Sequence, residues 1–336
     1  MGLNLPLTCR LSWQACAPKH PPSLTIALSA LQAERTYTFA QWHRLGIDIQ
    51  ARYRLFQRQQ LSIDAVLTSP WELVVLTWVL FHQSYRIQPG HWHCTLSDIT
   101  DPTQRSLIGK GLGSSAAVIV GLLQNLFQQH RLTYTPSQLL DLACECEQYQ
   151  HGFSSGLDPA TQIEGGVIRF CKNQPIQSID GPQIKGWLVD TGRPQPPTGK
   201  VVQAVQTQWP RHHGIWASFG QITDRIQHHF QAQQWPAFNQ ALNDNQQRLV
   251  HIGVVPERVQ RFIQALHNAL DSKDRRAGIK LCGAGAHLGQ AGGMVFVHHS
   301  HCDPALCEAY GYPLFAIHTT QTGAQCHRVN TETEHD

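Results

Sequence analysis

The sequence predicts an α+β fold in two domains, and three observations lead to this prediction. Strand-like and helix-like segments are mixed in both halves, without the regular alternation of a doubly wound parallel sheet. A polar, turn-rich stretch at residues 171–186 separates the halves, so we place the boundary near Gly181, with one domain over 1–180 and the other over 181–336. The second half follows the strand and helix order of a ferredoxin-like domain.

The first half is predicted to contain three strands and three helices. β-type residues dominate or alternate with polar ones at 7–15, 23–31 and 86–99. Residues 71–83 are apolar on more than one face, which is typical of a buried helix, and an apolar run at 118–130 predicts a second. A third helix is expected to start at Thr135-Pro136-Ser137 and to end at Gly152.

The second half is predicted to begin with an apolar strand at 187–192. We expect one long helix over the Gln-rich run from about Ser218 to Ile252, and a shorter one over 256–270. Three further strands are expected at 279–285, 292–299 and 314–321.

Composition excludes several classes of protein. The chain has 336 residues, of which 41% are hydrophobic and 15% charged, with a formal charge of +3. Because its lysines and arginines are scattered, we expect no nucleic acid as a partner. No stretch approaches the roughly 18 apolar residues of a membrane span, and the N-terminus lacks the layout of a signal peptide, so we expect a cytoplasmic protein with no membrane partner. The ten cysteines are dispersed in apolar segments, which favours free thiols.

The strongest functional signal is the glycine-rich run GKGLGSSAA at residues 109–117, which lies between a strand and an apolar helix. Glycines let the backbone approach an anion closely, and the N–H groups at a helix start favour negative charge, so a triphosphate would fit here. The run is not a Walker-type P-loop, because Gly111 stands where that pattern requires Ser or Thr. The run itself leaves open a second interpretation, a tight turn of small residues that serves helix packing.

A second signal is the run EQYQHGFSSGLD at residues 147–158. Phosphoryl transfer needs a carboxylate that orients or deprotonates the attacking hydroxyl, and cations that neutralise the phosphates. Glu147, near a helix end, and Asp158, in the following loop, are candidates for a metal ligand and a base. Their spacing alone favours another interpretation, with Glu147 on a solvated helix face and Asp158 capping a turn before Pro159.

Both runs resemble motifs of one superfamily, the galactokinase, homoserine kinase, mevalonate kinase and phosphomevalonate kinase (GHMP) superfamily. GLGSSAA is similar to the segment that wraps the nucleotide phosphates in that family. The pattern E-x-x-x-H-G-x-x-S-G-x-D, followed by Glu164-Gly165-Gly166, resembles mevalonate kinases in particular. The resemblance extends from about residue 100 to 330 and includes LNDNQQRLVHIGV, which is similar to a helix that lines the family's substrate cleft.

This resemblance implies an enzyme that uses ATP and Mg²⁺ to phosphorylate the primary hydroxyl of mevalonate, a small-molecule substrate, giving 5-phosphomevalonate. It also implies a role for each matching residue. The nucleotide would bind at Gly111, Leu112, Gly113, Ser114, Ser115 and Ala116. Mg²⁺ would bind at Ser115 and Glu147, and the catalytic residues would be Asp158 and Lys110. Substrate would contact His151, Ser155, Gly283, Ala284 and Gly285.

The chain departs from the family pattern in two places. The third glycine-rich turn begins with Gly283-Ala284-Gly285 but continues with Ala286 and a longer loop than usual. The family's leading P-G-K-x-x-x-x-G-E-x segment is not found before residues 7–15. Either a leading segment is missing, or this is a divergent member that replaces or has lost the lysine, with Lys110 as the candidate substitute cation. A phosphomevalonate kinase, another GHMP kinase and a catalytically silent nucleotide-binding member therefore stay open as alternatives, as does a homodimer.

Other patterns are weaker. The histidines at positions 91, 93, 298, 299 and 301 lack the paired spacing of a zinc site, so we expect ordinary surface histidines. The glycines at 283, 285 and 289 do not form a dinucleotide-binding turn, because a strand follows where that motif needs a helix.

Overall fold

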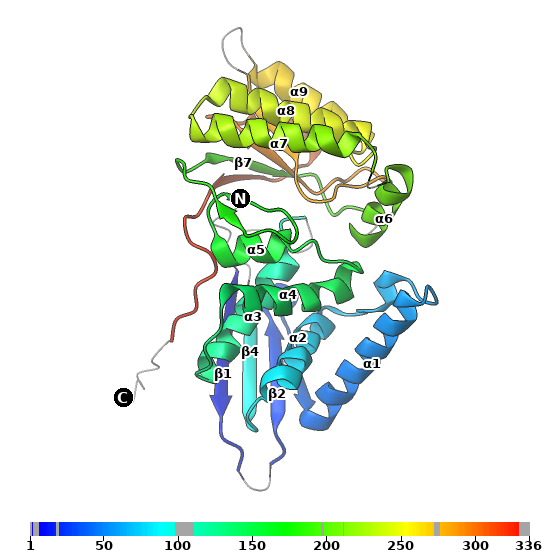
Figure 1. Ribbon diagram of the computed structural model, residues 1–336, viewed down its shortest axis with the longest axis vertical. Coiled ribbons are helices and arrows are strands. Elements are labelled where there is room, and N and C mark those ends of the chain that lie inside the picture. Colours follow the sequence, from blue (N-terminus) through cyan, green and yellow to red (C-terminus); the bar gives the residue numbers. More distant parts are fainter. Residues whose placement is uncertain are drawn as a thin grey trace.

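The structure is a computed structural model that describes residues 2, 7–17, 20–97, 111–195, 198–210, 212–271 and 276–328. Two four-stranded sheets, each with its own helices, lie one above the other along the long axis of the molecule (Figure 1). Helices and strands are mixed in both halves, so the predicted α+β class is confirmed. The boundary near Gly181 stays a prediction.

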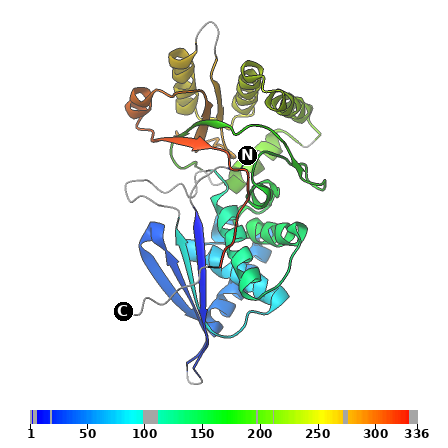
Figure 2. The same ribbon diagram turned by 90° about the vertical axis from the view of Figure 1, so that its left-hand side faces the viewer.

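The first domain is a sheet with helices packed on one face (Figure 2). The strand order is β1–β4–β2–β3, in which β2 and β4 are parallel and the other neighbours antiparallel. The strands are β1 (Thr8–Gln14), β2 (Ser23–Leu28), β3 (Ala33–Thr38) and β4 (His91–Ser97). Alternation along β4 places Trp92, Cys94 and Leu96 in the core.

The helices of this domain begin and end where local chemistry requires. They are α1 (Phe39–Gln57), α2 (Pro70–Tyr85), α3 (Ser114–Gln129), α4 (Pro136–His151) and α5 (Leu157–Glu164), with short 3₁₀ turns at Ser29–Leu31 and Ile63–Ala65. The apolar α2 contacts α1, α3 and α4 and is buried among them, as its sequence predicts. A capping box at Thr135 starts α4, and Gly152 ends it in the left-handed conformation, at φ 77°.

The second domain has the β-α-β-β-α-β order and the β10–β7–β9–β8 sheet of a ferredoxin-like fold, with every neighbouring pair antiparallel. Its strands are β7 (Lys185–Asp190), β8 (Gly278–Leu281), β9 (Met294–His298) and β10 (Leu314–His318), and a small hairpin, β5 (Ile168–Arg169) and β6 (Gln177–Ser178), precedes them. Its helices are α6 (Thr198–Gln208), α7 (Ile215–Gln231), α8 (Trp235–His251), α9 (Glu257–Leu270) and α10 (Pro304–Tyr310). Successive strand residues join different clusters, since Leu188 packs with Phe238 of α8 and Val189 with Phe262 of α9.

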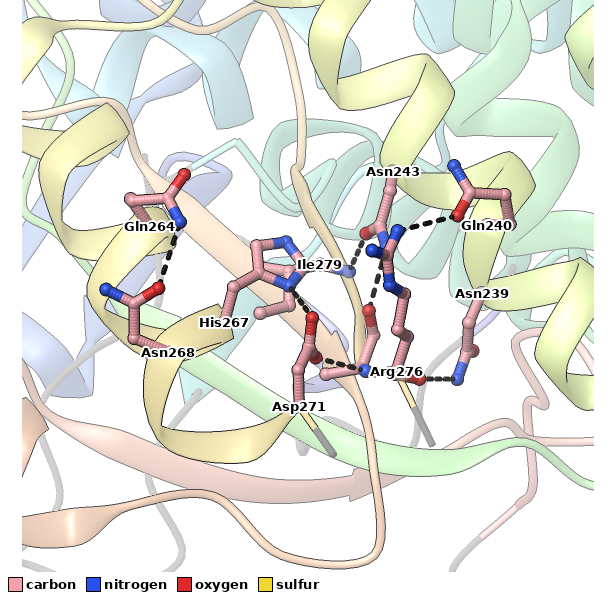
Figure 3. Close-up of polar contacts among 10 residues, drawn as sticks. Asn239, Gln240, Asn243, Gln264, His267, Asn268, Asp271, Arg276 and Ile279 are labelled. Carbon is pink, nitrogen blue, oxygen red and sulfur yellow. Dashed lines mark hydrogen bonds and ion pairs between the residues drawn. The ribbon is translucent and has the colours of Figure 1, made fainter. Parts of the chain in front are cut away.

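The edge strand β8 is bonded along its outer side by amide side chains of α8 (Figure 3). Asn243 accepts from the Ile279 N–H at 2.8 Å and donates to the Ala277 carbonyl at 2.9 Å. One turn further along α8, Gln246 accepts from the Leu281 N–H at 2.8 Å. These bonds satisfy the free edge of the sheet and hold β8 between β9 and α8.

The sequence analysis did not predict β3, α1 or α5 of the first domain. Two further sequence predictions of secondary structure are wrong. The single helix expected from Ser218 to Ile252 is two helices, α7 and α8, because Gln233 takes a left-handed conformation at φ 54° and Pro236 follows in the first turn of α8. Asp158 does not lie in a loop but in the first turn of the short helix α5.

The segment after β10, coloured red in Figure 1, leaves the second domain and runs along the first. We call its residues, Thr319–Arg328, the C-terminal strap. The Gly166 N–H donates to the Thr320 carbonyl at 2.8 Å, and the Ala324 N–H donates to the Gln162 carbonyl at 2.6 Å. Because Gln162 lies in the last turn of α5, the strap caps the C-terminal end of that helix.

All ten cysteines are free thiols. Within the described part of the chain, every helix is too short or too polar to cross a membrane.

Candidate active site

The glycine-rich loop leads directly into α3. Gly113 is the residue before the helix and has φ 68°, a conformation that glycine adopts without strain. Ser114, Ser115 and Ala116 form the first turn of α3, where N–H groups have no acceptor within the helix and the helix dipole is positive. This start of α3 is therefore a suitable place for an anion.

Asp158 lies against this loop. A Cβ atom added to Gly113 would be 3.1 Å from Cγ of Asp158, so the backbone of the loop contacts the carboxyl group. The structure thus brings two segments that are distant in sequence to the short separation that a phosphate donor and a base require.

The local turn before α5 orients Asp158. Gly156, with φ 85°, precedes the helix, and the hydroxyls of Ser154 and Ser155 accept from the N–H groups of Gly156 and Leu157 at 3.1 and 3.2 Å. The Asp158 side chain is open to the cavity described below, yet the surrounding protein displaces enough water to raise its pKa.

Glu147 lies next to Asp158, on the last turns of α4. It is only 4% exposed, and its Oε2 accepts a hydrogen bond from Ser154 Oγ at 2.5 Å. Burial raises the pKa of Glu147 to about 7, the Ser154 bond opposes this shift, and the charge of Asp158 adds to it. A solvated position for Glu147 is therefore excluded, and Ser154, which the sequence analysis did not select, is the residue that holds it.

Ser115 faces the same end of α4. Its Oγ lies 3.5 Å from Nε2 of His151, whose pKa is lowered by burial, so the imidazole is neutral at pH 7. His151 is four residues after Glu147 and so lies on the same side of α4. The hydroxyl of Ser115 and the carboxylate of Glu147 are oxygen donors of the kind that Mg²⁺ prefers, and nucleotide phosphates would complete the coordination. Within the described residues no group of three His, Cys, Asp or Glu side chains forms a metal site by itself.

The third glycine-rich turn meets the first. A Cβ atom on Gly283 would be 2.7 Å from the Gly111 carbonyl oxygen, so the two loops touch across the domains. Gly285 has a different surrounding, since its Cβ atom would lie 2.1 Å from the Val254 carbonyl oxygen. Ala284 lines a separate apolar cavity of about 410 Å³, together with Trp209 and Trp216.

Of the residues predicted to contact substrate, the structure places some beside the glycine-rich loop or Ser115 and others in contacts that support the backbone. Gly283 lies at the loop contact and His151 beside Ser115, whereas Ser155 bonds the start of α5 and Gly285 packs against backbone. Leu112 packs with a cluster of the second domain that includes Leu188 and Phe296. Lys110, predicted as a substitute cation, lies outside the described residues.

A cavity of about 770 Å³ lies between the domains at this point. It is lined by Gly111, Leu112, Ser114 and Asp158 of the first domain, and by Gly283 of the second. The described residues that bring charged or basic side chains to it are Arg10, Asp158, Lys280 and His327. Positive groups thus outnumber the single carboxylate, which suits a polyanionic ligand.

The sequence analysis missed Lys280. The available signal was its position in IKLCGAG, where alternation places it on the opposite face from the apolar Ile279 and Leu281.

The chain is similar to known proteins in sequence and in fold. The family model described as GHMP kinases N terminal domain matches residues 77–166. The chain is 30% identical to a mevalonate kinase of Thermococcus sibiricus over 101 residues, which are 30% of each chain. It is 24% identical to a mevalonate kinase of Pyrococcus horikoshii over 190 residues, 54% of this chain and 55% of the relative. The matched sequence thus spans about a third to about half of these curated relatives.

The similarity of fold extends further. The crystal structure of Methanococcus jannaschii mevalonate kinase is similar with a TM-score of 0.68 at 15% identity, over 95% of this chain and 90% of that one.

Proposed function

We propose that this chain, which has the GHMP kinase fold and a GHMP kinase N-terminal domain at residues 77–166, is an ATP-dependent kinase of a small alcohol, and that the alcohol is mevalonate. The observation that carries the proposal is the contact between Gly113 and Asp158, which places a carboxyl group at the anion-binding start of α3. The sequence similarity to mevalonate kinases supports the choice of acceptor.

In this mechanism Asp158 orients the primary hydroxyl of mevalonate and accepts its proton. The hydroxyl oxygen bonds to the γ-phosphorus while the bond from that phosphorus to the oxygen of ADP breaks, giving 5-phosphomevalonate and ADP. The raised pKa of Asp158 makes it a stronger base than an exposed aspartate. The first turn of α3 holds the phosphates, and the loop contact between Gly111 and Gly283 brings the second domain against them.

Ser115 and Glu147 would hold Mg²⁺, which when bound neutralises phosphate charge. The chain's own contribution is to keep Glu147 in place through Ser154.

The test replaces the proposed base. Asp158→Asn keeps the shape of the side chain and removes its ability to accept the proton, so we expect turnover to fall by on the order of a hundredfold or more with ATP affinity little changed. Asp303→Asn is the matched control, because Asp303 precedes α10 as its N-cap, and asparagine caps helices equally well. ADP release and calorimetric ATP binding measure the two quantities.

The same assay decides the acceptor when mevalonate, phosphomevalonate, homoserine and galactose are offered in parallel. Turnover of phosphomevalonate alone would assign the protein to phosphomevalonate kinases. Tight ATP binding without turnover of any acceptor would contradict the kinase proposal and identify a silent nucleotide-binding protein.

A further inference from the structure

Lys280 reaches the cavity from the second domain. It lies on β8, and its neighbours Ile279 and Leu281 point into the core of that domain, so its side chain points to the opposite face. Two residues later on the same face, Cys282 also lines the cavity, and the Cys282 carbonyl oxygen is 3.6 Å from where a Cβ atom on Gly111 would lie. Lys280 therefore faces the same space as the glycine-rich loop and Asp158.

The strand that carries Lys280 is held on both sides. β9 pairs with it through Lys280 opposite Phe296. On the other edge, α8 bonds β8 through Asn243 (Figure 3) and, three residues later, through Gln246. The backbone beside Lys280 is thus fixed before any ligand arrives, which lowers the entropy that binding has to overcome.

The ammonium group is available for a ligand. The structure gives it one hydrogen bond, from Nζ to the Leu281 carbonyl oxygen at 2.8 Å, and the described residues show no carboxylate paired with it. A lysine ammonium has three donors, so two remain. A cation that is half-buried, without a carboxylate partner and directed into a cavity is suited to bind phosphate oxygens.

We propose that Lys280 binds the terminal phosphates of the nucleotide in the interdomain cavity. This inference rests on the proposed function, because it takes the cavity to be the nucleotide site. It assigns the phosphates to both domains, with the start of α3 on one side and the ammonium group of β8 on the other.

The test measures calorimetric affinities for MgATP, MgADP and AMP in the wild type, Lys280→Ala and Lys280→Arg. In the wild type, affinity should rise with each added phosphate. In Lys280→Ala this rise in affinity should be smaller. The affinity for MgATP should fall about tenfold or more, whereas the affinity for AMP should stay nearly unchanged. The reason is that the variant loses a charge-assisted hydrogen bond only to ligands that have a terminal phosphate. Lys280→Arg keeps the charge and should restore part of the MgATP affinity.

Lys185→Ala is the matched control, since Lys185 is an exposed strand lysine of the same sheet outside the cavity, and it should leave all three affinities unchanged. Unchanged MgATP affinity in Lys280→Ala would overturn the inference, as would an equal loss for AMP, which would mean a structural role. Circular dichroism of each variant shows whether it is folded.

The outcomes separate this inference from the proposed function. If the wild type phosphorylates mevalonate and Lys280→Ala binds MgATP as tightly as the wild type, the proposed function stands and the inference about Lys280 is wrong. If Lys280→Ala weakens MgATP binding but the wild type phosphorylates none of the acceptors, the inference about Lys280 stands and the proposed kinase function is wrong.

Discussion

Glu147 and Asp158 are two neighbouring carboxyl groups with raised pKa values in different surroundings. Burial raises the pKa of Glu147, and the protein around the cavity displaces enough water to raise the pKa of Asp158. Glu147 is enclosed by protein and bonded by Ser154, whereas Asp158 opens to the cavity. A pKa of about 7 leaves Glu147 partly protonated at neutral pH, and a nearby cation would favour its ionised form. This difference suits Glu147 to a metal ligand and Asp158 to a group that meets substrate.

The pH dependence of stability follows from Glu147. The folded protein holds the Glu147 proton up to pH about 7, while the unfolded chain releases it near the ordinary value of 4.5. The unfolded state therefore binds fewer protons between these values, so the free energy of unfolding should fall as pH rises from 4.5 to 7. In Glu147→Gln this fall should shrink by about 2–3 kcal/mol, leaving the variant more stable than the wild type at pH 8.

Urea unfolding at pH 4.5 and pH 8, without divalent cations, measures this effect. Glu257→Gln is the control, because the side chain of Glu257 is 80% exposed. If the free energy of unfolding changes with pH in the same way in the wild type and in Glu147→Gln, then burial of this carboxyl group does not destabilise the folded protein at high pH.

Individual site residues were selected where a short run resembles a family motif. The runs that contain Gly113 and Asp158 also allow a purely structural interpretation, and the resemblance to the GHMP superfamily decided between the two. Lys280 was not selected, because it lines the cavity only through the placement of β8 in the folded second domain. The buried position of Glu147 was also beyond the sequence, since it results from packing and from the bond to Ser154.

At the level of elements, local chemistry predicted some bounds, but α1 was missed although a capping box at Thr38 begins it. The bounds of α4 follow from Thr135 and Gly152, and the alternation in β4 predicts its buried face. The split between α7 and α8 was missed although Pro236 was a readable signal for a new helix start. The break itself is made by a left-handed glutamine, Gln233, which the sequence does not mark. The hydrogen bonds between α8 and the edge of β8 could not be predicted, because amide side chains on a helix do not indicate which groups they will bond.

The C-terminal strap gives a prediction for Gly165, which follows α5. Its φ of 71° and ψ of −162° are accessible essentially to glycine alone, and a Cβ atom would be 2.1 Å from the Thr322 carbonyl carbon. We expect Gly165→Ala to destabilise the protein by about 3 kcal/mol or more, since it adds backbone strain and pushes the strap away. Gly311→Ala should cost only about 1 kcal/mol, because Gly311 has φ 72° but open space around it.

Chemical unfolding of both variants checks this comparison. Equal losses of stability would mean that backbone conformation alone matters and that the strap does not press against α5.

At the scale of the whole molecule, the two domains meet at contacts that surround the site. The glycine turns touch through Gly111 and Gly283, and the strap runs from the second domain along the first. On another side, Lys200 of α6 forms an ion pair with Asp64 at 2.5 Å. The two-domain arrangement was predictable from the change in composition, but these contacts were not, because each joins residues far apart in sequence.

The contact between α6 and α4 leads to a last prediction. Gly199, in the first turn of α6, packs so closely that an added Cβ atom would lie 2.8 Å from the His151 carbonyl oxygen and 3.3 Å from a methyl group of Ile63. Gly199→Ala must therefore push α6 away from the end of α4, where His151 lies beside Ser115. We expect a stability loss of about 1–2 kcal/mol and a fall in turnover of about tenfold, since small displacements of reacting groups cost rate steeply. Gly220→Ala, in α7 with open space around it, should leave turnover unchanged and stabilise the helix slightly. Wild-type turnover in a folded Gly199→Ala protein would show that the α6 contact does not position the site.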